Sequence, residues 1–363
     1  MVHYSHYDPA IIEYSNILQE SPLEILVCPL RMPQPDIVKI CSENINNFPG
    51  HIDRLILDDY TEAPGLDIIE QIICNVVSQG KIARSNILFV NGGAAESTQQ
   101  IVSWPTFCNL DGFRTGVYTA DAVVPWEARS NIFISLARRP VWYRVALTEE
   151  FIKKNLLEHS LISCGSDVFS SQDPWKEVHV SQKLQHYFPM LLDGAMTRES
   201  EHYKHSLDFS NAFINVVSES SHDKFPRWER YINHKFNLPE SHQHHTRVFI
   251  TEKTVKAIAM RQLPIFNTVV GHVHFLRGIG LDMFDDIIDH SYDNEADPDK
   301  RIQMVANEVE RLYHSGIKFL ATIPNIKYRL ERNFDCFKQF NERQRALAIQ
   351  KIKDFLNHGH TTI

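Results

Sequence analysis

The stretch RVFITEKTVKAIAMRQLPIF (residues 247–266) contains the pattern that decides the fold. An apolar run, RVFI, precedes a charged start, then a helical repeat with Val255, Ile258 and Ala259 available for burial, then a second apolar run, LPIF. Short apolar runs that alternate with amphipathic helices are typical of parallel α/β sheets. We therefore expect a strand, a helix and a short buried strand here.

The same alternation runs along the rest of the chain. Before this stretch, the pattern predicts strands at residues 24–30, 51–60, 86–93, 112–121, 131–140 and 213–220, and helices at residues 66–80 and 146–159. After it, further helices are predicted from residue 272, from residue 297 and from about residue 325 to the end.

Chain length sets the number of domains. A chain of 363 residues is too long for one ordinary domain and suits two. We predict an α/β protein of two Rossmann-like lobes that face a cleft. The N-terminal lobe spans residues 1–128, the second lobe spans 129–320, and helices at 321–363 pack back across the lobes.

Composition argues against several classes of protein. No run of about 18 apolar residues is present, so we expect no membrane span. The N-terminal residues lack the pattern of a secretory signal, which favours a cytoplasmic protein. The net charge of −8 is unlike that of a nonspecific nucleic-acid binder. Six scattered cysteines without a C-x-x-C pair indicate free thiols.

Three arginines follow the strand predicted at residues 131–140. Arg138, Arg139 and Arg144 lie where that strand passes into a helix. Backbone amides at a helix N-terminus favour an anion. A guanidinium group can donate two parallel hydrogen bonds to the oxygens of one phosphate. The stretch therefore predicts a phosphate site. The alternative is a solvated basic turn whose charges pair with their neighbours.

A second charged pair opens the helix that follows RVFI. Glu252 and Lys253 stand at its first positions. A carboxylate there is favoured by the helix dipole and is placed to accept hydrogen bonds from a ribose, as acidic residues do in nucleotide-binding folds. The ammonium of Lys253 is suited to a phosphate. The alternative is a helix start that merely bears charges.

The sequence TEK, followed by a helix and a short buried strand, resembles the donor-binding motif of fucosyltransferase-like glycosyltransferases of the two-lobed GT-B type. VVSES, which contains Glu219, looks like the strand with an acidic end that precedes this motif. The segments ARRPVWYR…SCGS and FITEK…DPDKRI are more similar still to glycosyltransferase-like proteins of large bacteriophages. This resemblance covers residues 130–312.

The resemblance implies a nucleoside diphosphate sugar as donor. Glu252 would bind the ribose, Lys253 with Arg138 or Arg139 would bind the diphosphate, and Glu219 would lie near the donor. The stretch 221–250 departs from the fucosyltransferase pattern, so the donor sugar stays open. One acceptor is a 5-hydroxymethylated pyrimidine of phage DNA, which would place the protein in the host cytoplasm, and a cell-surface saccharide is the other.

The catalytic base is expected in the N-terminal lobe, on the acceptor side. Asp58 and Asp59 are favoured because they close a strongly apolar strand, and Glu96 and Asp121 are further candidates. Paired aspartates also suit Mg²⁺ or Mn²⁺ in a metal-dependent, single-lobed transferase. The predicted phosphate-binding cations make a metal less necessary, so no obligatory metal is expected. A non-catalytic nucleotide-binding protein is the remaining alternative.

Two histidines interrupt the apolar start of the helix predicted from residue 272. His272 and His274 alternate there. A hydrogen-bonded structural histidine is the default expectation for such a position.

Overall fold

The computed structural model describes most of the chain. The described residues are 2–4, 15–29, 43, 45, 47–48, 51–59, 66–78, 80, 82–91, 101–103, 123–137, 141–164, 187, 209–219 and 248–357. The chain forms two compact units. The first comprises Met1–Asn109, Pro226–Phe249 and Phe340–Ile363, and the second comprises Leu110–Phe225 and Ile250–Gln339.

A parallel sheet forms the centre of the first unit. Its strands lie in the order β1-β2-β3-β4-β5, and they are Val2–Tyr4, Ile25–Pro29, Arg54–Asp59, Ile87–Asn91 and Ile101–Ser103. The strands predicted at 24–30, 51–60 and 86–93 are confirmed. Strands β1 and β5 were not predicted, because three residues are too few for a period-two pattern. The strand predicted at 112–121 lies outside the described residues.

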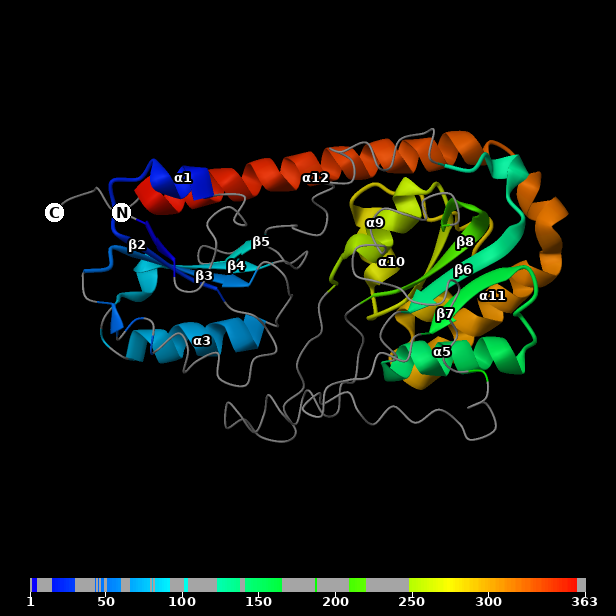
Figure 1. The fold of residues 1–363 in the computed structure, drawn as a ribbon, viewed down its shortest axis with the longest axis horizontal. Helices are drawn as coiled ribbons and strands as arrows, with labels where there is room; N and C mark the ends of the chain where they lie inside the picture. The colour runs from blue at the N-terminus through cyan, green and yellow to red at the C-terminus, as the bar shows by residue number, and fades with distance from the viewer. Residues whose placement is uncertain are drawn as a thin grey trace. The chain divides into compact units, whose positions relative to one another are not determined.

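Helices cover both faces of this sheet (Figure 1). Alternate strand residues point to opposite faces. On one face, Leu55 and Leu57 pack with the apolar side of α3 (Leu66–Ser78). On the other, Ile56 packs with α1 (Ser15–Gln19) and with the C-terminal part of α12 (Ile326–Asn357).

The second unit has a four-stranded parallel sheet with a different order. The order is β7-β6-β8-β9, and the strands are Ser160–Cys164, Asn131–Ala137, Ala212–Ser218 and Leu263–Asn267. From β6 the chain passes first to the neighbour on one side, β7, and then to the neighbour on the other side, β8. Open α/β sheets bind ligands at such a switch point, beyond the carboxyl ends of the strands.

Helices lie on both faces of the second sheet as well. Helices α9 (Glu252–Ala259) and α10 (His272–Gly278) cover one face, and α5 (Trp142–Lys153) and α11 (Pro298–Ala321) cover the other (Figure 1). Short 3-10 turns complete the described elements: η2 (Arg84–Asn86), η4 (Trp126–Ala128) and η6 (Ser291–Asn294).

One predicted strand is wrong. Residues 248–250 carry no strand pairing and lead directly into α9. Phe249 and Ile250 are buried, so the apolar pattern of this segment reflects burial and not membership of a sheet.

The C-terminal helices predicted from about residue 325 form one helix, α12, which belongs to both units. Its first part is fixed to the second unit by the Arg329 guanidinium, which pairs with Asp282 and Asp286, and by an ion pair between Glu331 and Arg261. Its C-terminal part belongs to the first unit. Among the described residues, no helix has the length and apolar character needed to cross a membrane.

Candidate site at the carboxyl edge of the second sheet

Glu219 follows directly on β8, at the switch point of the second sheet, and is fully buried. Its carboxylate accepts hydrogen bonds from the amide nitrogens of Thr251 and Thr254, at 3.0 and 3.2 Å. The hydroxyl of Thr254 donates to it at 2.5 Å, and the hydroxyl of Thr251 also donates to it. A buried carboxylate that receives four hydrogen bonds is well compensated for the water it has lost.

These bonds fix the start of α9. Thr251 is the N-cap residue, with an extended backbone, and its hydroxyl oxygen accepts from the Lys253 amide at 3.3 Å. The helix follows because Val255 and Ile258 form an apolar side that is buried in the unit. The Glu219 carboxylate stands where a helix N-terminus attracts negative charge.

Glu252 and Lys253 project from this fixed helix start and are partly exposed. The Lys253 ammonium lies 2.7 Å from the Glu252 carboxylate and 3.2 Å from the Thr251 hydroxyl. Partial burial alone would raise the pKa of the Glu252 carboxyl, but Lys253, with a smaller effect from Lys256, lowers it to about 2. Glu252 is therefore ionised near neutral pH, as an acceptor of hydrogen bonds from a diol must be.

The start of α5 meets the same edge. The buried hydroxyl of Tyr143 donates to the carbonyl oxygen of Glu219 at 2.5 Å. The buried guanidinium of Arg144 donates to the carbonyl oxygens of Ser218 and Glu219, both at 3.3 Å. Burial raises the pKa of the Tyr143 hydroxyl, so it stays protonated and remains a donor.

Asn267, the last residue of β9, completes this arrangement. Its buried amide donates to the carbonyl oxygen of Tyr143 and to the hydroxyl of Ser218, both at 3.2 Å. The exits of β8 and β9 and the starts of α5 and α9 are thus joined by hydrogen bonds. We call this set the edge network: Tyr143, Arg144, Ser218, Glu219, Thr251, Thr254 and Asn267.

The edge network sets the chemistry available here. The Glu219 carboxylate already accepts a hydrogen bond from the Thr254 amide in the first turn of α9. It therefore occupies the position that a ligand anion takes in many nucleotide folds. A phosphate at this edge would therefore depend on side-chain cations. Lys253 is such a cation; its ammonium is partly exposed and pairs with the carboxylate of Glu252, which is itself partly exposed.

Four of the predicted site residues share this edge: Arg144, Glu219, Glu252 and Lys253. Arg138 and Arg139 lie outside the described residues, although β6 and α5 on either side of them run to and from the same edge. Tyr143, Thr254 and Asn267 were not predicted. The two threonines flanking Glu252 and Lys253 were the available signal, because Thr is a common helix N-cap.

The predicted catalytic residues belong to the first unit. Asp58 and Asp59 are the last two residues of β3, opposite Val90 and Asn91 of β4. Asp58 is buried, and alternation along β3 places it on the same sheet face as Ile56. Asp59 is described in its backbone position only. Glu96 and Asp121 lie outside the described residues.

His272 departs from expectation. It is fully buried, its ring packs against that of Phe266 with centroids 4.7 Å apart, and neither ring nitrogen has a hydrogen-bond partner in the described part of the chain. The expectation of a hydrogen-bonded histidine is wrong here. His274, by contrast, is exposed.

The burial of His272 predicts a pH-dependent stability. Burial lowers the pKa of His272 from 6.5 to about 4, and the nearby Asp293 only partly opposes this. In the unfolded chain, His272 becomes protonated below about pH 6.5. In the folded chain, it becomes protonated only near pH 4. The free energy of unfolding should therefore fall by about 3 kcal/mol as the pH drops through this window.

The measurement is urea unfolding of the wild-type chain and of His272→Leu between pH 7 and pH 4.5. Other groups titrate in both proteins, so the difference between the two curves reports His272. The variant should lose less stability on acidification. Parallel curves would contradict the assignment.

Comparisons with protein-family models, curated proteins and solved structures found no match to this chain. In the described part of the chain, no group of three His, Cys, Asp or Glu side chains is arranged to hold a metal ion.

Proposed function

We propose that this chain is a GT-B type glycosyltransferase that binds a nucleoside diphosphate sugar at the carboxyl edge of the second sheet. The sugar would pass to an acceptor hydroxyl. One observation carries the proposal: Glu252 and Lys253 are held at the start of α9, beside the switch point, by a buried edge network. An accessible carboxylate and an accessible ammonium in this position suit the ribose and the diphosphate of one ligand.

Each residue has a distinct role in this proposal. Lys253 neutralises the diphosphate, whose negative charge grows as it becomes the leaving group. Glu252 accepts hydrogen bonds from the ribose hydroxyls. Arg138 and Arg139, on the loop after β6, bring further positive charge. The ion pair between Glu252 and Lys253 keeps both groups in place before the donor binds.

The acceptor reacts through a carboxylate base from the first unit, for which Asp58 or Asp59 is proposed. No obligatory metal is invoked, because the cations at the second sheet supply the charge. The acceptor is the hydroxyl of a 5-hydroxymethylated pyrimidine in phage DNA, or else a saccharide of the cell surface. A base in DNA would have to leave the duplex stack to react.

Lys253→Ala tests the donor site. We expect the variant to hydrolyse its best nucleoside diphosphate sugar, or to transfer the sugar from it, on the order of tenfold more slowly than wild type. The reason is that the Lys253 ammonium no longer neutralises the leaving diphosphate. The donor is first identified by thermal-shift screening with UDP, GDP and ADP sugars. A ligand at 100 times its Kd adds about 2.7 kcal/mol of stability.

Lys318→Ala is the matched control, since Lys318 is an exposed lysine of the same unit at the end of α11. It should behave as wild type. If no nucleotide stabilises the chain, the proposal fails. If nucleotides bind but turnover is absent with and without Mg²⁺, a binding protein is indicated instead. Turnover that collapses in EDTA would assign the chemistry to a metal.

A further inference from the structure

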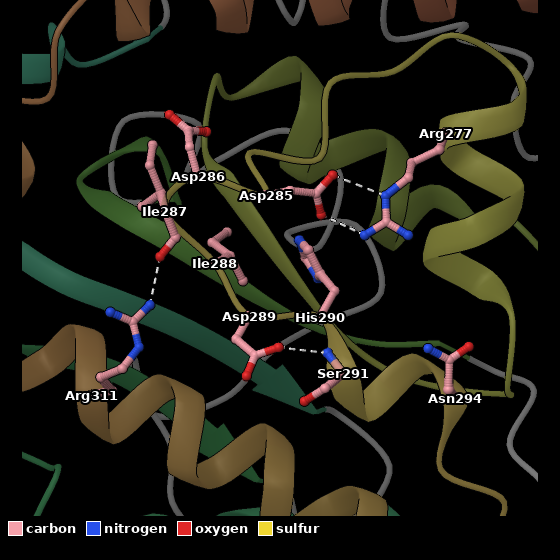
Figure 2. Close-up of a pocket in the computed structure, with 10 residues that line it drawn as sticks. All are labelled: Arg277, Asp285, Asp286, Ile287, Ile288, Asp289, His290, Ser291, Asn294 and Arg311. Atoms are coloured by element: carbon pink, nitrogen blue, oxygen red, sulfur yellow. Dashed lines mark hydrogen bonds and ion pairs between the residues drawn. The ribbon is translucent and has the colours of Figure 1, made fainter.

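A pocket of about 500 Å³ lies in the second unit, between α10, η6 and α11 (Figure 2). Arg277 of α10, Asn294 of η6 and Arg311 of α11 line it, together with Asp285, Asp289 and His290 of the segment between α10 and η6. No member of the edge network lines it, nor does Glu252 or Lys253. Its volume is that of a small-molecule site.

One lining residue, His290, is a buried histidine whose protonation state is fixed by its neighbours. His290 Nε2 lies 2.7 Å from the carbonyl oxygen of Met283, which can only accept, so Nε2 carries the proton. Nδ1 therefore accepts from the hydroxyl of Tyr292 at 2.7 Å, and that hydroxyl accepts from the amide of Phe266 in β9. Burial also lowers the pKa of His290, which keeps the ring neutral.

The walls are held in place from both sides. On the α10 side, Arg277 pairs with Asp285 through two hydrogen bonds, of 3.0 and 2.5 Å. On the α11 side, Arg311 pairs with Glu308 and donates to the carbonyl oxygen of Ile287, and Glu308 accepts from the amide of Asp289 at 2.9 Å. The lining is therefore organised before any ligand enters, which lowers the entropic cost of binding.

The charged side chains of the pocket lining limit which ligands can bind there. Two guanidinium groups and three carboxylates line the pocket, the third being Asp286, which pairs with Arg329. The lining thus has a formal charge of −1, and both guanidinium groups already bind carboxylates. A phosphate would meet no uncompensated cation, and the carboxylates form no group suited to a metal in the described part of the chain. An anionic ligand and a metal ion are therefore both disfavoured.

Three polar groups of the lining bind no protein partner in the described part of the chain. They are one carboxylate oxygen of Asp289, the hydroxyl of Ser291 and the side-chain amide of Asn294. In Figure 2 they lie along one side of the pocket, on and beside η6. Together they offer both donors and acceptors, as the hydroxyls of a sugar ring require.

We infer that this pocket binds a neutral saccharide. Asp289 and Asn294 accept hydrogen bonds from ring hydroxyls, and Asn294, Ser291 and the Arg277 guanidinium donate to them. The site is separate from the edge network and does not depend on the proposed glycosyltransferase activity. In an enzyme that acts on glycans it would hold a second sugar residue, away from the reacting one.

Saturation-transfer NMR on the full chain tests the inference. The probes are the methyl pyranosides of glucose, galactose, mannose and N-acetylglucosamine. We expect at least one to bind, with a Kd on the order of 1 mM, as is usual for a small polar ligand. Asp289→Asn, which retains an oxygen for the Ser291 amide, and Asn294→Ala should each weaken this binding about fivefold or more.

Asp299→Asn is the matched control, because Asp299 is an exposed acid of the same unit outside the pocket. It should leave binding unchanged. Absence of binding by every glycoside, or binding that both pocket variants leave intact, would overturn the inference. Inorganic phosphate or spermidine that competes for the pocket would overturn the ligand class. Lys253→Ala should leave glycoside binding intact even where nucleotide binding is lost, which separates this site from the donor site.

Discussion

Replacing Arg129 by alanine is expected to lower the free energy of unfolding of the second unit by about 3–5 kcal/mol. Arg129 is only 3% exposed and lies just before β6. Its guanidinium donates to the carbonyl oxygens of Ala212, Met260 and Arg261 at 2.8 to 3.0 Å.

Those three oxygens belong to segments far apart in the sequence. Ala212 begins β8, and Met260 and Arg261 precede β9, so one side chain joins the starts of three strands. Burial lowers the pKa of Arg129 to about 9, with a smaller contribution from Arg261, which still leaves it charged at pH 7. Truncation removes a donor from each of these carbonyl oxygens, of which the Ala212 oxygen keeps the Gln262 amide. A buried acceptor left without a donor costs about 1–3 kcal/mol.

Urea unfolding followed by tryptophan fluorescence measures the loss, because the Arg129 guanidinium lies over the ring of Trp126, 4.8 Å from its centre. Arg129→Lys retains the charge but cannot reach every acceptor, and it should fall between wild type and Arg129→Ala. Arg332→Ala, at an exposed position of α12, should change stability by less than about 0.5 kcal/mol. An Arg129→Ala loss as small as that of the control would contradict the structural role.

The fold class was predictable because its signal is local. Runs such as EILVCPL and NILFVNGG are long and apolar enough to predict β2 and β4, and both strands are buried as expected. Strand order was not predictable, since it depends on pairing between distant segments. The order β7-β6-β8-β9 is what brings the ends of β6 and β8 together and defines the switch point.

The candidate site was predictable in part for the same reason. Glu252 and Lys253 stand out as charges at a helix start, whereas the roles of Tyr143 and Asn267 arise from contacts across more than 100 residues. His272 shows what the sequence does not reveal about a residue whose position it does predict. Its position on an apolar helix start was visible in the sequence, but the lack of a hydrogen-bond partner in the described part of the chain is a property of the packed structure.

Glu219 is the residue on which the candidate site most depends. Glu219→Ala should lower the free energy of unfolding by about 4 kcal/mol, because four hydrogen-bond donors of Thr251 and Thr254 lose their acceptor. The start of α9 should loosen with it. Nucleoside diphosphate binding, which the proposed function requires, should therefore weaken on the order of tenfold or more, although Glu219 is too deeply buried to touch the ligand.

Glu219→Gln separates stability from positioning. Its remaining oxygen can still accept from Thr254 and from the Thr251 amide, while its new NH₂ group faces the Thr251 hydroxyl, which loses its acceptor and already accepts from Lys253. We expect a loss of about 1–2 kcal/mol and near wild-type nucleotide affinity. Asp335→Ala, at an exposed position of α12, should change neither quantity.

Binding must be measured at a temperature at which every variant is fully folded, as judged by circular dichroism. Under that condition, weaker nucleotide binding by Glu219→Ala reflects the displaced start of α9 and not loss of folded protein. If Glu219→Ala lowers stability while nucleotide affinity is unchanged, the ligand does not use Glu252 and Lys253 as placed here. The carboxyl edge of the second sheet would then no longer be supported as the donor site, because the edge network that holds those two side chains would have no effect on nucleotide binding.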